Sequence, residues 1–116
     1  MILADTSVWI DHFRNTNKEL SDLLIADRLC IHPFIIEEIA CGNLANREST
    51  IDYLSSLRQI PVSSHSEVME LIKQRRIFGS GLGSVDANLI ASCLFAGAEL
   101  FTLDKNLAQV WARCKP

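Results

Sequence analysis

The chain has 116 residues, of which 48% are hydrophobic and 22% are charged, and its formal net charge is −3. This composition excludes an intrinsically disordered chain, and the length suits one globular domain over residues 1–116. The apolar runs are too short for a membrane span. No basic segment precedes the first apolar residues, so we expect no secretory signal and a cytoplasmic location. A net negative charge argues, at first sight, against a nucleic-acid binder.

Strands and helices are expected to alternate along the chain, which is typical of a parallel sheet covered by helices. Pro33 suits the first turn of a helix and Gly42 its end. We expect Thr6 or Ser7 to open the first helix. The expected elements of the first half are a strand over 1–5, helices over 8–13 and 18–26, a strand over 29–32, and helices over 33–41 and 47–57.

The second half continues the alternation. Ser64 and Glu67 have the spacing of a helix capping box, Ser84 is placed to cap the most apolar helix, and Gly97 is placed to end it. The expected elements are a strand over 59–62, a helix from 64 to 77, a glycine loop over 79–83, a helix over 85–96, a strand over 99–103 and a helix over 106–114. We therefore predict a three-layer α/β fold, with a central parallel sheet of four to five short strands.

The four cysteines are spaced irregularly and include no Cys-x-x-Cys pair. Three of them lie in apolar surroundings, so we expect small buried thiols in a reducing compartment. The cysteines and the three histidines lack the ligand spacing of a zinc site. The four cysteines are Cys30, Cys41, Cys93 and Cys114.

Carboxylates follow the first and the last expected strands, where Asp5 and Asp104 end apolar runs. The functional crevice of an open α/β sheet lies at the carboxyl ends of its strands. Glu38 lies in the second turn of a helix that begins at the same edge and can reach the crevice. Asp86 is not placed by the order of the elements, because two helices separate the third and fourth strands. Taken singly, Asp5 and Asp104 also suit turns after strands, and Asp86 suits a helix N-terminus. Glu38, next to Glu37, also suits a solvated helix face.

A site made of four carboxylates would supply the hard oxygen ligands that Mg²⁺ and Mn²⁺ prefer. It would also change the meaning of the net charge. Without these four acids the chain has 11 basic and 10 acidic residues, and bound divalent cations reverse the local sign. The net charge therefore does not decide whether the partner is a nucleic acid.

Four segments in this order resemble the PIN-domain ribonucleases and, more narrowly, the VapC-type toxins of bacterial toxin–antitoxin pairs. The resemblance implies a metal-dependent endoribonuclease, a hydrolase of RNA phosphodiester bonds whose acids bind Mg²⁺ or Mn²⁺. Carried over to this chain, those acids are Asp5, Glu38, Asp86 and Asp104, so the resemblance brings Asp86 into the site. The segments that carry it are Asp5 to Asp11, Glu37 to Gly42, Gly83 to Ala87 and Thr102 to Lys105.

The resemblance also selects among neighbouring residues. Glu38 is chosen over Glu37 because the glutamate of the family stands four residues before a glycine, here Gly42. Ser7 is a candidate to hold Asp5 or a metal-bound water. Asn106 stands where many relatives have a further acid. It can contact a metal-bound water but adds no charge, so the choice between one cation and two stays open. The chain stops at Pro116, and a last edge strand is expected to be absent or very short.

A toxin of this kind is expected to form a homodimer and to be inhibited by a small cognate antitoxin protein. Apolar residues of the first helices, namely Trp9, Ile10, Phe13 and Leu24, are the expected docking surface. The rival interpretation is a non-catalytic PIN-like module that binds RNA or protein, against which the retention of all four acids argues. A separate basic cluster, Lys73 with Arg75 and Arg76, suits either phosphate contacts or a solvated helix end.

Overall fold

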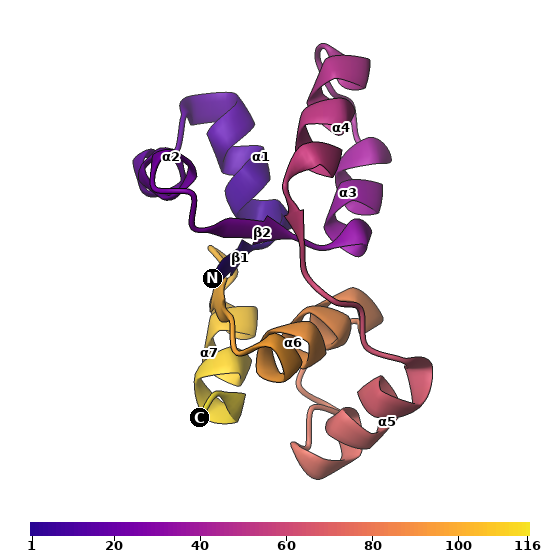
Figure 1. Ribbon diagram of the computed structural model, residues 1–116. Coiled ribbons are helices and arrows are strands. Elements are labelled where there is room, and N and C mark those ends of the chain that lie inside the picture. The colour runs from indigo at the N-terminus through magenta and orange to yellow at the C-terminus, as the bar shows by residue number, and fades with distance from the viewer.

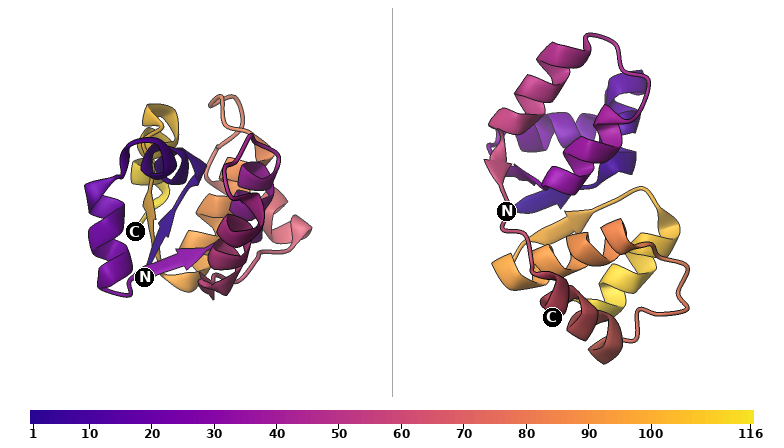
Figure 2. Two further views of the ribbon diagram at one scale, coloured as in Figure 1. Left: turned by 90° about the horizontal axis from the view of Figure 1, so that it is seen from above. Right: turned by 90° about the vertical axis from the view of Figure 1, so that its right-hand side faces the viewer.

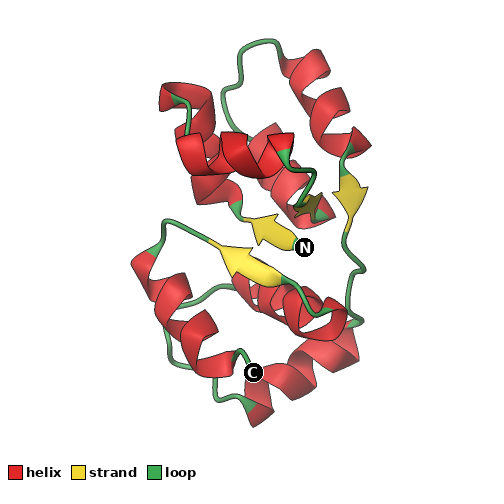
Figure 3. Ribbon diagram, turned by 60° about the vertical axis from the view of Figure 1, so that its left-hand side comes forward, coloured by secondary structure: helices red, strands yellow, loops and turns green.

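Four short parallel strands form the centre of the computed structural model, which describes all 116 residues. Their spatial order is β3-β2-β1-β4, so the first strand lies inside the sheet and the last strand at an edge. Figure 3 shows these strands between the helices. The strands are β1 (Ile2–Ala4), β2 (Leu29–Ile31), β3 (Arg58–Gln59) and β4 (Glu99–Phe101).

Seven helices cover the two faces of the sheet, four on one side and three on the other (Figure 1). The predicted three-layer α/β fold is therefore confirmed, with four strands and none after the last helix. None of the helices has the length and apolar composition that crossing a membrane requires. The first group is α1 (Thr6–Asn15), α2 (Lys18–Ile25), α3 (Pro33–Ala40) and α4 (Arg47–Ser56), and the second is α5 (His65–Gln74), α6 (Ser84–Ala96) and α7 (Lys105–Cys114).

The division of the helices follows from the handedness of the connections. Crossovers between parallel strands are right-handed, so the path from β1 through β2 to β3 puts α1 to α4 on one face. The chain then returns to the far side of β1 to form β4, and this reversal puts α5 and α6 on the other face. The strand order thus changes direction between β1 and β4. At such a point a crevice opens at the carboxyl ends of the strands.

The same topology places Asp86, which counting elements from the sequence did not. A helix that leads directly into a parallel strand runs antiparallel to it, so its N-terminus lies at the carboxyl edge of the sheet. The helix before β4 is α6, and Asp86 lies in its first turn. The number of helices between β3 and β4 therefore does not matter. Only the direction of α6, the helix that leads into β4, decides where Asp86 lies.

The core is built on the two central strands and the helices packed against them. Leu3, Ala4 and Ile31 are fully buried, and β1 pairs with both neighbours along its length. The thiols of Cys30, Cys93 and Cys114 are buried and that of Cys41 is exposed, all four unpaired, as the apolar surroundings of three of them predicted. Trp9 is fully buried as well. The expectation that it offers an exposed docking surface is therefore wrong, because α1 packs on β1 and α3 with this side chain inside.

Several helix ends follow the predicted capping rules. Pro33 is the first residue of α3, Ser64 and Glu67 form the capping box of α5, and Gly97 ends α6 with a φ of 68°. His32 caps α3, because its Nδ1 accepts a hydrogen bond from the backbone N–H of Phe34 at 3.0 Å. Burial lowers the pKa of His32 to about 4, so the imidazole is neutral and can act as this acceptor.

Other predicted boundaries are wrong. The residue that caps α1 is Asp5, not Thr6 or Ser7, and α1 therefore begins at Thr6. The cap position of α6 is taken by Gly83, which has no side chain to bond, and Ser84 is already helical. The third strand covers only Arg58–Gln59 instead of residues 59–62. Its partner β2 ends at Ile31, so no backbone remains for a longer ladder.

Candidate functional site

The four predicted acids come from four different elements at the carboxyl edge of the sheet. Asp5 follows β1 and caps α1, and Asp104 follows β4 and caps α7. Glu38 lies in the second turn of α3, and Asp86 lies in the first turn of α6. The helices α1 and α7 lie on opposite faces of the sheet (Figure 1). The acids therefore surround the point between β1 and β4 where the strand order reverses.

Asp5 is the best-held of these side chains. It is 5% exposed, and both of its carboxylate oxygens accept hydrogen bonds. Oδ1 accepts from the hydroxyl of Ser7 at 2.5 Å and from the N–H of Val8 at 3.2 Å. Oδ2 accepts from the hydroxyl of Thr102 at 2.5 Å. The buried charge is thereby stabilised and its orientation is fixed, as a buried carboxylate requires.

The two hydroxyls that hold Asp5 also join the loops that follow β1 and β4. The Ser7 Oγ accepts a hydrogen bond from the N–H of Leu103 at 3.0 Å, and the Thr102 Oγ1 accepts one from the N–H of Asp104 at 3.0 Å. Each hydroxyl thus donates to the carboxylate of Asp5 and accepts from a backbone N–H of the loop after β4. We call this pair of residues the hydroxyl clamp. It sets the position of Asp104 relative to Asp5.

Glu38 has a partner of the same type. The hydroxyl of Thr6, the first residue of α1, donates to its Oε1 at 2.6 Å. The glutamate is exposed, and it reaches across from α3 to α1. This contact keeps the flexible side chain at the edge where the other acids lie. A shallow hollow of about 360 Å³ lies beside it, between α3 and α6, lined by Phe34, Glu37, Glu38, Cys41 and Val85.

Asp86 has the clearest electrostatic signature. Its pKa is raised to about 6, first by partial burial and then by the negative charges of Asp104, Asp5 and Glu38. Each of the other three acids therefore acts on this carboxyl group through space. Negative charges that raise the pKa of a neighbouring carboxyl group lie close enough to repel its charged form. A bound cation would remove both the repulsion and the cost of burying the charge.

The acids face one another but are not drawn into a ligand shell. No group of three or more His, Cys, Asp or Glu side chains is spaced to hold a metal ion as it stands. The chemistry of the acids still fits a hard divalent cation, because all four predicted ligands are carboxylates.

Asn106 makes two hydrogen bonds beside Asp104. Its side-chain Nδ2 donates to the carbonyl of Ser80 at 3.0 Å, and its backbone N–H donates to Oδ1 of Asp104 at 2.9 Å. It therefore connects the loop between α5 and α6 to the cap of α7. Gly81 allows this close approach, since a Cβ there would lie 3.1 Å from the Asn106 amide nitrogen.

Two residues that position acids were missed in the sequence. Thr6 stands next to Asp5, but its hydrogen-bond partner Glu38 is 32 residues away. Thr102 stands two residues before Asp104, but its partner Asp5 is 97 residues away. Hydroxyl residues beside an acid are too common to be singled out by type. A polar residue at the end of the apolar run before Asp104 was the only available signal.

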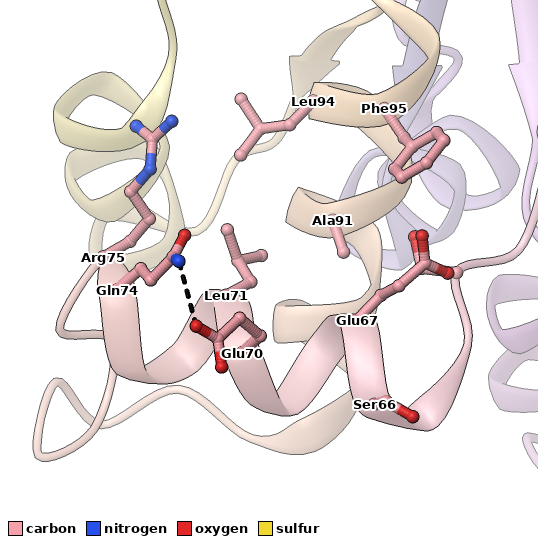
Figure 4. Close-up of a pocket in the computed structure, with 10 residues that line it drawn as sticks. Ser66, Glu67, Glu70, Leu71, Gln74, Arg75, Ala91, Leu94 and Phe95 are labelled. Carbon is pink, nitrogen blue, oxygen red and sulfur yellow. Dashed lines mark hydrogen bonds between the residues drawn. The ribbon is translucent and has the colours of Figure 1, made fainter.

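The largest hollow of the protein lies elsewhere. It has a volume of about 480 Å³, lies between α5 and α6, and contains none of the four acids. Figure 4 shows its lining, with Leu71, Leu94 and Phe95 beside the carboxylates of Glu67 and Glu70. Both of its carboxylates already accept hydrogen bonds, Glu67 from the backbone of Ser64 and Glu70 from Gln74. Size alone therefore does not identify the reactive part of this surface.

A central parallel sheet with four acids gathered at its carboxyl edge defines a class of acidic-site α/β domains, and comparison with known proteins gives the family. Residues 2–111 match the PIN domain family, so the chain belongs to it. The match includes all four acids.

Two relatives resemble almost the whole chain. Both are Ribonuclease VapC32, a VapC-type toxin, from Mycobacterium tuberculosis strains CDC 1551 / Oshkosh and ATCC 25618 / H37Rv. Each is 49% identical over 108 residues, which cover 92% of this chain and 87% of the relative. The resemblance to PIN-domain proteins of the VapC type that four short segments predicted is therefore confirmed.

The hydroxyl clamp predicts a specific stability effect. Replacing Thr102 by Val keeps the shape of the side chain but leaves Oδ2 of the buried Asp5 without its donor. We expect Thr102→Val to lower the free energy of unfolding by about 1–3 kcal/mol, the usual cost of an unsatisfied buried acceptor. Urea denaturation of the cation-free protein measures this change.

Thr102→Ser is the matched control, because it keeps the hydroxyl and removes only a methyl group. Its unfolding free energy should lie within about 1 kcal/mol of the wild type. If the valine variant were as stable as the serine variant, the hydrogen bond to Asp5 would contribute nothing.

Proposed function

We propose that this protein is a divalent-cation-dependent endoribonuclease, with Mg²⁺ or Mn²⁺ held by Asp5, Glu38, Asp86 and Asp104. One observation carries the proposal: four carboxylates from four elements converge at the reversal point of the sheet, and three of them raise the pKa of the fourth. Such an arrangement costs stability and is explained by a cation that uses it. The relatives named above are ribonucleases by name, which supports RNA as the substrate.

The charge of the site bears on cation dependence. Four carboxylates repel the phosphates of RNA, so a polyanionic strand can approach this edge only when cations offset them. A divalent cation held there would lower the pKa of a water, orient the scissile phosphate and neutralise charge that develops on it. The chain itself supplies the geometry. The hydroxyl clamp fixes Asp5 and the loop of Asp104, and Thr6 fixes Glu38.

Asp86 has a further part in this proposal. Its side chain makes no hydrogen bond with another side chain, it is half-buried, and its charge is disfavoured by burial and by the three other acids. It therefore gains more than its partners when a cation arrives. We assign it to completing the ligand set on the α6 side of the crevice, opposite Glu38 on α3.

The direct test is RNA cleavage by the purified protein without any partner, in Mg²⁺, in Mn²⁺ and in EDTA. We expect cleavage with either cation and none with EDTA. Asp5→Asn and Asp86→Asn should each lower the rate more than about a hundredfold, since even residues that only orient metal ligands contribute about 10- to 100-fold.

The control is Asp52→Asn, which removes an exposed carboxylate of α4 that makes no hydrogen bond or ion pair and should cleave like the wild type. RNA binding without cleavage in every condition, by folded protein, would favour the rival non-catalytic module. Equal cleavage in EDTA would refute the metal site.

We also propose that a cognate antitoxin binds the groove between α1 and the segment that leads into α4. This groove has a volume of about 400 Å³, and Ile10, Phe13 and Leu44 supply its apolar lining beside Arg14. Phe13 is 39% exposed. Leu24 does not line it, so only Ile10 and Phe13 of the expected docking residues remain in the proposed surface. An apolar side chain of the antitoxin would fill the groove.

Phe13→Asp should weaken antitoxin binding at least about tenfold, because an aromatic anchor at the centre of an interface usually contributes more than that. The matched control, Val62→Asp, puts the same charge on an exposed apolar residue outside this groove and should bind normally. Unchanged affinity of Phe13→Asp for the antitoxin would exclude this groove.

Light scattering of the free protein tests the proposed homodimer, which is expected at twice 13.0 kDa.

A further inference from the structure

The ends of α5 and α7 bring basic side chains together from distant parts of the sequence. Lys73 and Arg75 lie at the end of α5, Arg76 follows them, and Arg113 lies in the last turn of α7. All four are exposed. We call them the basic face.

Hydrogen bonds to the backbone fix part of the basic face in place. The guanidinium of Arg113 donates to the carbonyls of Arg75 and Arg76, at 2.7 Å and 3.4 Å. In return, the guanidinium of Arg75 donates to the carbonyl of Cys114 at 2.6 Å. Figure 4 shows Arg75 extending from the end of α5 toward α7. Two arginines are thus locked side by side, although 38 residues separate them.

No carboxylate neutralises these cations. The three ion pairs of the protein involve Lys18, Arg58 and Lys115, and none involves a member of the basic face. The acids of α5 form no ion pair with these cations. Glu67 belongs to the capping box at the other end of the helix, and Glu70, which lines the same hollow as Arg75, accepts a hydrogen bond from Gln74. Complementing the helix dipoles explains one cation at each helix end. It does not explain three arginines held together by hydrogen bonds to the backbone, with Lys73 two residues before Arg75, on a protein of net charge −3.

The basic face is joined to the acids by the loop between α5 and α6. This loop begins at Arg76 and leads to Asp86, and its middle is held against α7 by the bond from Asn106 to the carbonyl of Ser80. In the right view of Figure 2 it runs beside the first turns of α7. Phe78, on this loop, is 65% exposed. An exposed aromatic ring beside cations is the combination that stacks a base and holds its phosphate.

The distance also suits a nucleic-acid strand. Asp104 caps the start of α7 and Arg113 lies in its last turn, so they are about 15 Å apart along a helix of this length. At about 3.4 Å per stacked nucleotide this corresponds to about four nucleotides. A strand cut at the acidic edge would therefore reach the basic face within a few nucleotides of the scissile bond.

We propose that the basic face and Phe78 form a binding track for the single-stranded RNA that flanks the cleavage site. The cations contact phosphates, and the Phe78 ring stacks a base between them and the acids. This inference rests on the proposed ribonuclease function and extends it to a second, cation-independent part of the substrate surface. An acidic peptide is disfavoured as the occupant, because the track leads through an aromatic loop to a cluster of carboxylates that would repel it.

The test is the affinity of the full-length protein for a fluorescein-labelled 12-nucleotide RNA, measured by anisotropy in EDTA so that the strand stays intact. The variant is the double substitution Lys73→Gln with Arg76→Gln, since neither side chain makes a hydrogen bond or ion pair in the folded protein. The control is Arg28→Gln with Arg47→Gln. It removes the same charge from two exposed arginines at the start of β2 and of α4.

We expect the basic-face variant to bind RNA about tenfold more weakly than the wild type at low salt. The slope of log affinity against log salt should fall by about 1.4, or about 0.7 for each lost phosphate contact with a single strand. Phe78→Ala should weaken binding with the slope unchanged, because stacking involves no counterion. The control pair should change affinity less than twofold.

Three results would overturn the inference. If the basic-face variant binds RNA like the control while the wild-type protein cleaves RNA, the track is wrong and the ribonuclease proposal stands. If the variant binds RNA normally but loses its antitoxin, the basic face is a protein-binding surface. If the wild-type protein neither binds nor cleaves RNA, the proposed function fails together with this inference.

Discussion

The hydrogen bonds that Ser7 and Thr102 donate to Asp5 are the constraint on which the acidic edge depends. They hold a 5%-exposed carboxylate in one orientation and tie the loop after β1 to the loop after β4. The same hydroxyls accept the N–H groups of Leu103 and Asp104. A negative charge at the end of a buried strand is thereby stabilised without a cationic partner, and it stays available to an external cation.

The remaining acids are held by weaker devices, and this difference is consistent with the proposed chemistry. Glu38 has one hydroxyl partner, whereas Asp86 has none. Burial and the charges of the other three acids raise the pKa of Asp86. In the proposed function, rigid positioning of Asp5 after β1, with more adjustable acids on α3 and α6, would let a cation draw the carboxylates together. In the proposed function, the basic face binds the RNA that flanks the cleavage site, and this contact needs no bound metal cation.

The sequence predicted the architecture well, because alternating apolar segments, the capping box at Ser64 and Gly97 are local signals. It also gave the acids that end strands, since position in a parallel sheet follows from order. It could not supply contacts between distant residues, such as Thr102 with Asp5. Trp9 was misjudged because an amphipathic helix does not tell which apolar side chains stay outside. Asp86 was left unplaced because the prediction counted elements and did not use the direction of the helix that leads into the last strand.

The most direct measurement is the melting temperature of the wild type and of Asp86→Asn, each in EDTA and in Mn²⁺, with Asp52→Asn as the control. If the carboxylates repel one another until a cation binds, Asp86→Asn should melt higher than the wild type in EDTA, by a few degrees for about 1 kcal/mol of relieved repulsion. It should also gain much less from Mn²⁺. A variant that melts lower in EDTA and gains as much from Mn²⁺ as the wild type would contradict the account.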